Sequence, residues 1–382
     1  MFHPDSIGPL IMITSLRLTS FRNLTDKELV FGNQVNFIYG KNGSGKSSLL
    51  EAIYALNYGK TFRSSRLKHA IKKHSSQFTL FGQVLVNDLP KVHHIGLTKS
   101  NSGDSVVINN QKQANLSLFS QTHPVQIIEP GSFYLLEGGP EVRRKFLDWG
   151  VFHVEHKFLA AWRRYKKSLK QRNALLRRDK IDGQEMEIWT QHFCNSATEV
   201  SGYRERYYAL MEEQLNQMLP ETPLSEFNKF SVHYYPGWDK EKSLSSVLEE
   251  HFDRDKKYKY THYGPQKADI RLRIGVDNVN HVLSRGQQKL LIALLKIIQT
   301  KVVHRVTSYQ PTLLFDDIDS ELDEDYLQAV INLAIRHNKQ LFLTSTSLQV
   351  MNKLNCDADI KMFHVEHGLV NAVGNNLESM ND

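Results

Sequence analysis

The sequence predicts an α/β fold that a long helical segment interrupts. Three observations lead to this prediction. Residues 35–39 form an apolar run of strand length, and a glycine-rich turn joins it to a helical pattern over residues 46–57. A second apolar run, residues 311–315, ends in two adjacent carboxylates. Between these runs, residues 142–219 are polar, helical in pattern and poor in turn residues.

The glycine-rich turn completes the pattern Gly-x-x-x-x-Gly-Lys-Ser at residues 40–47. In such a turn the glycines let successive backbone N–H groups point at phosphate oxygens, and the helix N-terminus adds partial positive charge. Lys46 is expected to reach the outer phosphates of a nucleotide, and the Ser47 hydroxyl to bind Mg²⁺. The predicted phosphate-binding residues are Gly40, Lys41, Asn42, Gly43, Ser44, Gly45, Lys46, Ser47 and Ser48.

The carboxylates after residue 315 supply chemistry that a phosphate loop lacks. Asp316 is placed to hold Mg²⁺ through water, and Asp317 to orient or deprotonate an attacking water. Together with Lys46 they are the predicted catalytic residues. The simpler alternative is a core strand that ends in an Asp-Asp turn.

Two further segments flank this strand. Residues 283–289 read Leu-Ser-Arg-Gly-Gln-Gln-Lys and precede an apolar helix. Ser284 and Gln287 fit a capping box there. Residues 320–323 read Ser-Glu-Leu-Asp. Taken alone, each segment is also consistent with an ordinary helix start.

In this order the four elements resemble the ATP-binding cassette ATPases of the SMC-like branch. There, Ser-x-Gly-Gln is the signature motif, which contacts the nucleotide held by a second subunit, and Ser-Glu-Leu-Asp stands at the position of the D-loop. The resemblance implies an α/β ATPase head with an inserted helical arm. It also implies nucleotide contacts from Ser284, Gly286 and Gln287, and a Gln contact to Mg²⁺, for which Gln126 is the candidate.

Finer motifs resemble the RecF family of bacterial recombination mediator ATPases, from about Met12 to about Val370. They are residues 20–24 (Ser-Phe-Arg-Asn-Leu), 59–63 (Gly-Lys-Thr-Phe-Arg), 136–140 (Leu-Glu-Gly-Gly-Pro), 143–150 (Arg-Arg-Lys-Phe-Leu-Asp-Trp-Gly) and 169–176 (Leu-Lys-Gln-Arg-Asn-Ala-Leu-Leu). The resemblance implies that Arg22 and Arg63 contact the nucleotide. Residues 264–269 carry Gln266 where the family usually has His, which puts any role of that imidazole in doubt.

The same resemblance implies a function in recombinational repair of gapped DNA. It implies an ATP-dependent homodimer that clamps double-stranded and gapped DNA, works with RecR and RecO, and helps load RecA where single-strand-binding protein competes. Transporter-type cassettes usually have Glu at the position of Asp317, whose shorter reach predicts a weak Mg-dependent ATPase used as a switch. The alternative is an ATPase subunit of another SMC-like or transporter-type assembly, which the basic inserted arm disfavours.

Basic residues are concentrated in two segments of the sequence. The chain of 382 residues has a formal net charge of +7, and residues 161–180 hold nine Lys or Arg and a single acid. On a helix, Arg163, Lys166, Lys167 and Lys170 share one face. A solvated helix face is the simple explanation, but residues 254–260 add a second basic cluster with interleaved tyrosines. The two clusters favour contact with a phosphate backbone.

The motif spacing predicts the domain organisation. We expect an N-terminal part of the head at residues 1–141, a helical arm at 142–224 and a C-terminal part of the head at 225–382. Residues 78–86, 92–99 and 106–109 alternate like an antiparallel meander, and shorter alternation recurs at 230–234 and 270–274.

The remaining features concern the cellular environment. No run reaches the roughly 18 apolar residues of a membrane span, and residues 1–11 lack the features of a secretory signal. The cytoplasm is therefore expected, without a membrane partner. Met12 begins the first strand-like run, so an extension or a misplaced start is one expectation for the 11 residues before it. Cys194 and Cys356 are expected to be buried reduced thiols.

Overall fold

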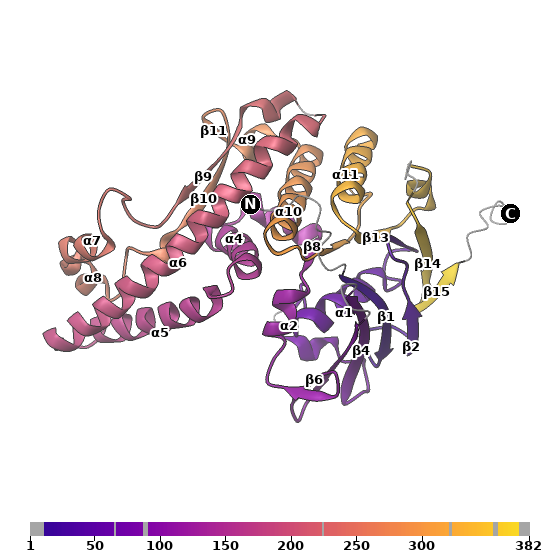
Figure 1. The fold of residues 1–382 in the computed structure, drawn as a ribbon, viewed down its shortest axis with the longest axis horizontal. Coiled ribbons are helices and arrows are strands. Elements are labelled where there is room, and N and C mark those ends of the chain that lie inside the picture. The colour runs from indigo at the N-terminus through magenta and orange to yellow at the C-terminus, as the bar shows by residue number, and fades with distance from the viewer. Residues whose placement is uncertain are drawn as a thin grey trace. The chain divides into compact units, whose positions relative to one another are not determined.

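The structure is a computed structural model that describes residues 11–64, 66–86, 91–223, 225–320, 323–353 and 358–373. It divides into two compact units, drawn in Figure 1. The first unit joins Met1–Ser132 to Arg285–Asp382, and the second is Phe133–Ser284. The first unit therefore holds both the phosphate loop and the paired carboxylates, although the second interrupts it in the chain.

A six-stranded sheet forms the centre of the first unit. In spatial order its strands are β15 (Leu369–Val373), β14 (Ile360–Glu366), β3 (Val35–Tyr39), β13 (Gln340–Ser345), β12 (Thr312–Phe315) and β8 (Val125–Ile128). All neighbours pair in parallel except the edge strand β15. Every residue of β3, β12 and β13 is buried. Strands covered on both faces need apolar side chains in both directions, which explains the continuous apolar runs in the sequence.

A second sheet of the first unit is antiparallel. Its strands, in spatial order, are β2 (Lys27–Val30), β1 (Ile11–Thr19), β4 (Gln77–Val86), β5 (Lys91–Ser100), β6 (Asp104–Ile108) and β7 (Gln111–Gln113). The predicted meander is confirmed as β4–β5–β6. Strand β4 alternates buried and half-buried side chains, the pattern of a sheet with one face on a core.

Helices cover the central sheet. Helix α1 (Lys46–Tyr58), predicted at residues 46–57, shares one buried core with both sheets, in which Ile53 and Leu56 pack with Leu80 and Phe342. Helices α10 (Arg285–Thr307) and α11 (Glu324–His337) pack against each other, and α10 contacts β8. The short helix α2 (Ser117–Thr122) contacts α1.

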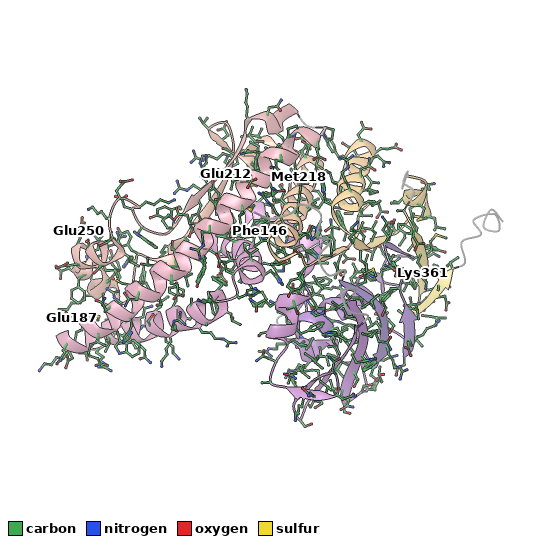
Figure 2. All side chains as sticks on the ribbon, in the orientation of Figure 1. Phe146, Glu187, Glu212, Met218, Glu250 and Lys361 are labelled. Carbon is green, nitrogen blue, oxygen red and sulfur yellow. The ribbon has the colours of Figure 1, made fainter. Side chains whose placement is uncertain are left out.

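The second unit combines three long helices with a small sheet. The long helices are α4 (Pro140–Val154), α5 (Phe158–Leu176) and α6 (Gly183–Met218). The strands of the sheet, in spatial order, are β11 (Asp277–Asn278), β10 (Asp269–Ile274) and β9 (Phe230–Tyr235). The short α-helices of the unit are α3 (Tyr134–Glu137), α7 (Leu244–Glu250), α8 (Phe252–Tyr258) and α9 (Val279–Val282). The Asp182 carboxylate accepts from the Glu185 N–H and so caps α6. Glu187, near the start of α6, is exposed, whereas Met218 at its end is buried (Figure 2).

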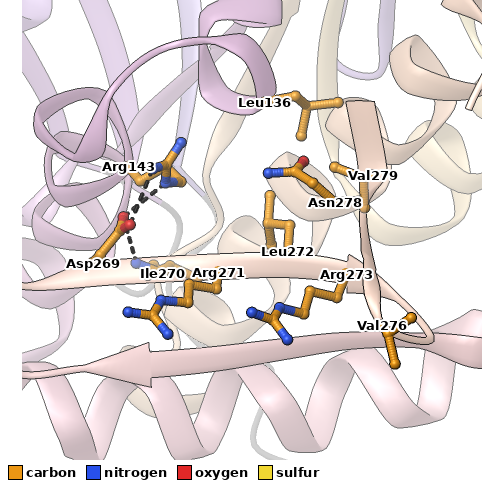
Figure 3. Close-up of a pocket in the computed structure, with 10 residues that line it drawn as sticks. All are labelled: Leu136, Arg143, Asp269, Ile270, Arg271, Leu272, Arg273, Val276, Asn278 and Val279. Atoms are coloured by element: carbon orange, nitrogen blue, oxygen red, sulfur yellow. Dashed lines mark hydrogen bonds and ion pairs between the residues drawn. The ribbon is translucent and has the colours of Figure 1, made fainter. Parts of the chain in front are cut away.

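Arginine–carboxylate pairs join the helices of this unit to its sheet and to one another. Arg143 of α4 donates to both oxygens of Asp269 on β10, at 2.7 and 3.0 Å (Figure 3). Arg204 of α6 donates to both oxygens of Asp148 on α4, at 2.7 and 2.9 Å. Two of the sequence motifs, at residues 143–150 and 264–269, are thus in direct contact.

These contacts explain a difference from the predicted boundaries. The prediction assigned residues 225–284 to the head, whereas the compact units place them with the helices. Alternating residues reveal that β9 and β10 are strands, but the helices that cover them, α6 and α4, decide the unit to which they belong.

Gln266, at the position where His is usual, has a structural role. Its amide nitrogen donates to the carbonyl oxygens of Thr261 (3.2 Å) and Tyr263 (2.9 Å), and its oxygen accepts from the Tyr165 hydroxyl at 3.1 Å. Its hydrogen-bonding groups therefore hold the 261–266 turn against α5.

Cys194 is buried and its thiol is free, as predicted, whereas Cys356 lies outside the described residues. Within the part of the chain that the structure describes, no helix has the length and apolar character needed to cross a membrane.

One ion pair of the second unit is fully enclosed. Arg172 of α5 and Asp255 of α8 both have 0% exposure, and their nearest N and O atoms are 2.7 Å apart. Arg172 also donates to the Thr261 hydroxyl at 2.6 Å. Burial of two charges is tolerated only when both are paired, so each partner depends on the other.

We expect Arg172→Met to destabilise the chain by about 3–5 kcal/mol, because it leaves the Asp255 carboxylate buried without its cation. Urea unfolding followed by circular dichroism measures this cost. Arg164→Met on the same helix is the control, since the Arg164–Glu199 pair is exposed and should contribute at most about 1 kcal/mol. Equal losses in the two variants would contradict the expectation.

Candidate functional site

The phosphate loop lies between the end of β3 and the start of α1. Gly45 precedes α1 with φ 124°, a left-handed conformation that favours glycine. Gly40 allows a close approach, because a Cβ built there would lie 2.2 Å from the carbonyl oxygen of Val365. Both glycines are therefore required by the shape of the turn that exposes the N-terminus of α1.

Lys46 folds back onto its own loop. Its Nζ donates to the carbonyl oxygens of Gly40 (2.6 Å) and Lys41 (3.1 Å). Burial lowers the pKa of Lys46, an effect opposed by the carboxylates of Asp317, Asp316 and Asp319. The two carbonyl oxygens thus hold the Lys46 ammonium beside the carboxylates. The charged oxygens of a phosphate can replace these neutral acceptors.

Asp316 connects three segments that are distant in the sequence. Its Oδ1 accepts from the Ser47 hydroxyl at 2.9 Å and from the Thr344 hydroxyl at 2.8 Å. Ser47 and Asp316 are separated by 269 residues in the chain. Burial raises the pKa of Asp316, while these two hydrogen bonds lower it. The phosphate loop and the end of β12 therefore meet at this carboxylate.

Asp317 has an unusual backbone conformation, with φ 58°. Its N–H donates to the Thr344 hydroxyl at 2.7 Å, and its carbonyl oxygen accepts from Lys289 Nζ at 2.8 Å. Lys289 also donates to the carbonyl oxygen of Ser320. The loop that carries Asp317 is thus tied to the first turns of α10, which begins within the predicted signature.

These residues open into a cavity of about 880 Å³ in the first unit. Of the predicted site residues, it is lined by Arg22, Asn42, Gly43, Gly45, Lys46, Ser47, Ser48, Arg63, Asp316 and Asp317. Gly40, Lys41 and Ser44 belong to the same loop. The lining also includes residues that the sequence analysis did not assign, namely Asn23, Phe62, His69, Ile71, Lys72, Lys73, Glu129, Pro130 and Thr344. Five Lys or Arg side chains against three carboxylates favour a polyanionic ligand.

The Phe-Arg-Asn element supports the loop from one side. Arg22 donates to both oxygens of the buried Glu51 carboxylate on α1, at 2.8 and 2.5 Å. Asn23 accepts from the Ser48 hydroxyl at 3.0 Å. Arg22 lines the cavity but is already paired, so its primary contact in this structure is with α1.

Gln126, the predicted Gln contact to Mg²⁺, does not lie at this cavity. It is 2% exposed, donates to Gln299 at 2.8 Å and accepts from Lys296 at 3.2 Å. Strand alternation gives the physical reason: Ile127 shares the core of α1, so Gln126 points to the opposite face of the sheet, where α10 packs. Its amide is used there to satisfy buried polar groups.

Glu129 is the carboxylate of this strand that reaches the cavity, because it directly follows β8. Its Oε2 accepts from the Gly131 N–H at 2.6 Å. Burial raises the pKa of Glu129, and Lys296 lowers it. Burial also lowers the pKa of Lys296 to about 8. The available sequence signal was the short, mostly apolar run Val125–Ile128, which Glu129 directly follows, although no strand was predicted there.

The signature residues begin α10. Gly286 and Gln287 lie in its first turn, and Ser284, which precedes it, is exposed. Of the described residues, those that line the cavity include neither Gly286 nor Gln287. In the predicted D-loop, Ser320 and Asp323 are described and the two residues between them are not; Asp323 directly precedes α11.

The donor groups at Ser47 and Asp316 fit Mg²⁺. A hydroxyl and a carboxylate offer the oxygen ligands that this cation prefers, and its remaining positions are commonly filled by water and phosphate. In the described ranges no group of three or more His, Cys, Asp or Glu is arranged to hold a metal ion.

Comparison with known proteins gives consistent results. Residues 12–371 match the family model described as RecF/RecN/SMC N terminal domain. The chain is 40% identical over 355 residues to the DNA replication and repair protein RecF of Azotobacter vinelandii, covering 92% of this chain and 96% of that protein. It is 39% identical over 362 residues to the protein of the same name from Pseudomonas syringae pv. syringae, covering 94% and 97%.

Solved structures have the same fold. The structure of the recombination mediator protein RecF-ATP in the RecFOR pathway superimposes with a TM-score of 0.84 and 25% identity, covering 98% of this chain and 100% of that chain. An Smc head bound to the C-winged helix domain of ScpA has a TM-score of 0.56 and 16% identity over 94% and 97% of the two chains, a likeness of fold alone. The α/β head is thus an SMC-like ATPase head, and the chain belongs to the RecF family.

Proposed function

We propose that this chain is a Mg-dependent ATPase that acts as a switch, closing as an ATP-bound dimer on gapped DNA during recombinational repair. The observation that carries the proposal is the meeting of Ser47, Asp316 and Thr344, which brings the phosphate loop beside Asp317. The curated relatives are DNA replication and repair proteins, and the similar solved structure is a RecF-ATP structure from the RecFOR pathway.

Each polar group of the cavity has a role in this proposal. Lys46 exchanges the carbonyl oxygens of its loop for the outer phosphate oxygens of ATP. Ser47 and Asp316 hold Mg²⁺, which neutralises charge on the phosphates when it is bound. Asp317 orients the attacking water and accepts its proton. Thr344 fixes both carboxylate-bearing residues through one hydroxyl.

The position of the signature supports the proposed dimer. Ser284 is exposed, and Gly286 and Gln287 begin a helix whose N-terminus favours an anion. Because the cavity of the same unit has its own phosphate loop, the natural anion for this helix is the nucleotide of a second copy. ATP then joins two copies, and hydrolysis separates them.

The DNA contact is proposed for the exposed face of α5. Arg163, Lys166, Lys167 and Lys170 are all exposed. Their neighbours Arg164 and Arg178 form ion pairs with Glu199 and Glu185, whereas the described ion pairs include none of the four. Four exposed cations on one helix face offer contacts to backbone phosphates. We also propose that RecR and RecO are the protein partners of this chain, and that the loading of RecA is an indirect result of this partnership.

We expect Asp317→Asn to bind ATP and dimerise but to hydrolyse ATP about 10²- to 10⁴-fold more slowly, since the amide cannot accept a proton. Light scattering with and without ATP measures dimerisation, and phosphate release measures turnover. Lys46→Ala is the matched variant: it removes a phosphate contact and should abolish both the ATP-dependent dimer and hydrolysis. If Lys46→Ala still dimerises with ATP and hydrolyses it like the wild type, residues 40–47 are not the nucleotide-binding loop.

Ser284→Arg should leave ATP binding intact and prevent dimerisation, because the larger side chain crowds a site that serves the partner's nucleotide. Mixing it with Lys46→Ala provides the sharper measurement. One of the two sites of the mixed pair then combines an intact loop with an intact signature, so light scattering should recover part of the dimer. If Ser284→Arg alone fails to bind ATP as a monomer, the signature acts within one chain.

Neutralising Arg163, Lys166, Lys167 and Lys170 to Gln should weaken duplex DNA binding equally for all sequences. In a plot of log affinity against log salt concentration, the magnitude of the slope should fall by roughly 0.9 for each lost phosphate contact. Fluorescence anisotropy in a salt series measures this slope. A control with Lys240→Gln and Lys242→Gln, whose lysines are paired with Glu205 and Glu250, should keep the wild-type slope. An unchanged slope in the quadruple variant would instead indicate a merely solvated helix face.

A further inference from the structure

Two tyrosines at the end of α8 are exposed to solvent. Tyr258 is 55% exposed and Tyr260 is 39% exposed. Single exposed aromatic residues are common on protein surfaces. These two differ from single exposed residues because both of their rings contact the same third ring.

That third ring is His262. Tyr260 stacks on it with ring centroids 4.0 Å apart and planes inclined by 29°. Tyr258 meets it in a T-shaped contact at 5.3 Å. Lys259, between the two tyrosines, has φ 60°, so the chain turns there and brings the rings to one centre. The three aromatic side chains form a compact platform.

A buried network holds the platform in place. His262 Nδ1 lies 2.9 Å from Asp255 Oδ1, and Asp255 is paired with the buried Arg172. The N–H and the hydroxyl of Thr261 both donate to Asn173 on α5, at 2.8 and 2.7 Å. The network thus fixes the His262 ring, which both tyrosine rings contact.

Cations surround the platform. Lys257 Nζ lies 5.6 Å from the centroid of the Tyr258 ring, and Lys267 Nζ lies 5.4 Å from that of Tyr260. Between residues 254 and 267 the sequence has a single acid, Asp255, which is buried and paired. The exposed cations of this segment are Arg254, Lys256, Lys257, Lys259 and Lys267.

We propose that Tyr258 and Tyr260 form a stacking site for the unpaired bases of single-stranded DNA. The bases replace Lys257 and Lys267 over the two rings, and the displaced and neighbouring lysines contact the phosphates. Exposed aromatic rings with flanking cations are the features by which proteins bind single strands without reading sequence. In a duplex the faces of the bases are already stacked, so these rings have no partner there. The proposal rests on the proposed function in gapped DNA, and adds a site for the single strand of the gap.

The location agrees with that function. Arg172 and Asn173, which hold the platform, lie on α5, and the same helix carries the four exposed cations proposed for the duplex. One helix therefore supports both a cationic face for paired DNA and an aromatic site for unpaired DNA.

The test measures fluorescence anisotropy of the full chain with ATP, using three labelled probes: an oligothymidylate, an abasic oligonucleotide of equal length, and a duplex. The variant Tyr258→Ala/Tyr260→Ala should bind oligothymidylate about tenfold or more weakly, while its affinity for the duplex and the abasic probe stays unchanged. Tyr258→Phe/Tyr260→Phe is the matched control, which keeps the rings and should keep the affinity. Tyr258→Ala alone, at the more exposed position, should give a smaller loss.

Three results would overturn the proposal. They are wild-type affinity of the double alanine variant for oligothymidylate, an equal loss on the abasic probe, and an equal loss in the phenylalanine variant. ATP-dependent light scattering of each variant reports whether the chain is folded. Failure of the proposed function is a separate result, since the wild-type chain would then bind none of the probes in the presence of ATP.

Discussion

The nucleotide cavity depends on the position of one buried carboxylate, Asp316. Hydroxyl groups from two other segments donate to the same oxygen of Asp316, and one of these hydroxyls, that of Thr344, also receives the N–H of Asp317. This convergence is possible because β12 pairs with β13, and β13 with β3, so that three parallel strands end at one edge of the sheet. The sheet order thus determines which residues meet.

The elements of this edge were predictable and several of its contacts were not. The apolar runs 35–39 and 311–315 could be recognised without a structure, because strands buried on both faces leave an unbroken apolar pattern. Thr344 and Lys289 have no such signal, since their partners lie on neighbouring elements that only the sheet order and the packing of α10 bring close. The family resemblance suggested Gln126 as a contact to Mg²⁺ but took no account of strand alternation. The alternation directs this side chain towards α10, while Glu129 reaches the cavity.

The second unit has ion pairs between its elements in addition to its buried apolar side chains. Arginines from α4, α5 and α6 each pair with a carboxylate on another element: Asp269, Asp255 and Asp148, respectively. Such pairs contribute little net stability, but an incorrect arrangement would leave a charge without its partner, so they select one geometry among several. These pairs also account for the difference between the predicted boundary at residue 225 and the compact units. The alternation of β9 and β10 is visible in the sequence, whereas the partners of their helices are not.

The backbone at Asp317 limits which acid can stand at that position. With φ 58°, the residue is in the left-handed region, where Asp and Asn are enriched among residues other than glycine. The conformation is fixed from both sides, by Thr344 at the N–H and by Lys289 at the carbonyl. A glutamate would extend further towards a phosphate but would have to adopt this backbone with a longer side chain. Replacement by glutamate would therefore place a longer side chain on a backbone conformation that Asp and Asn adopt more readily.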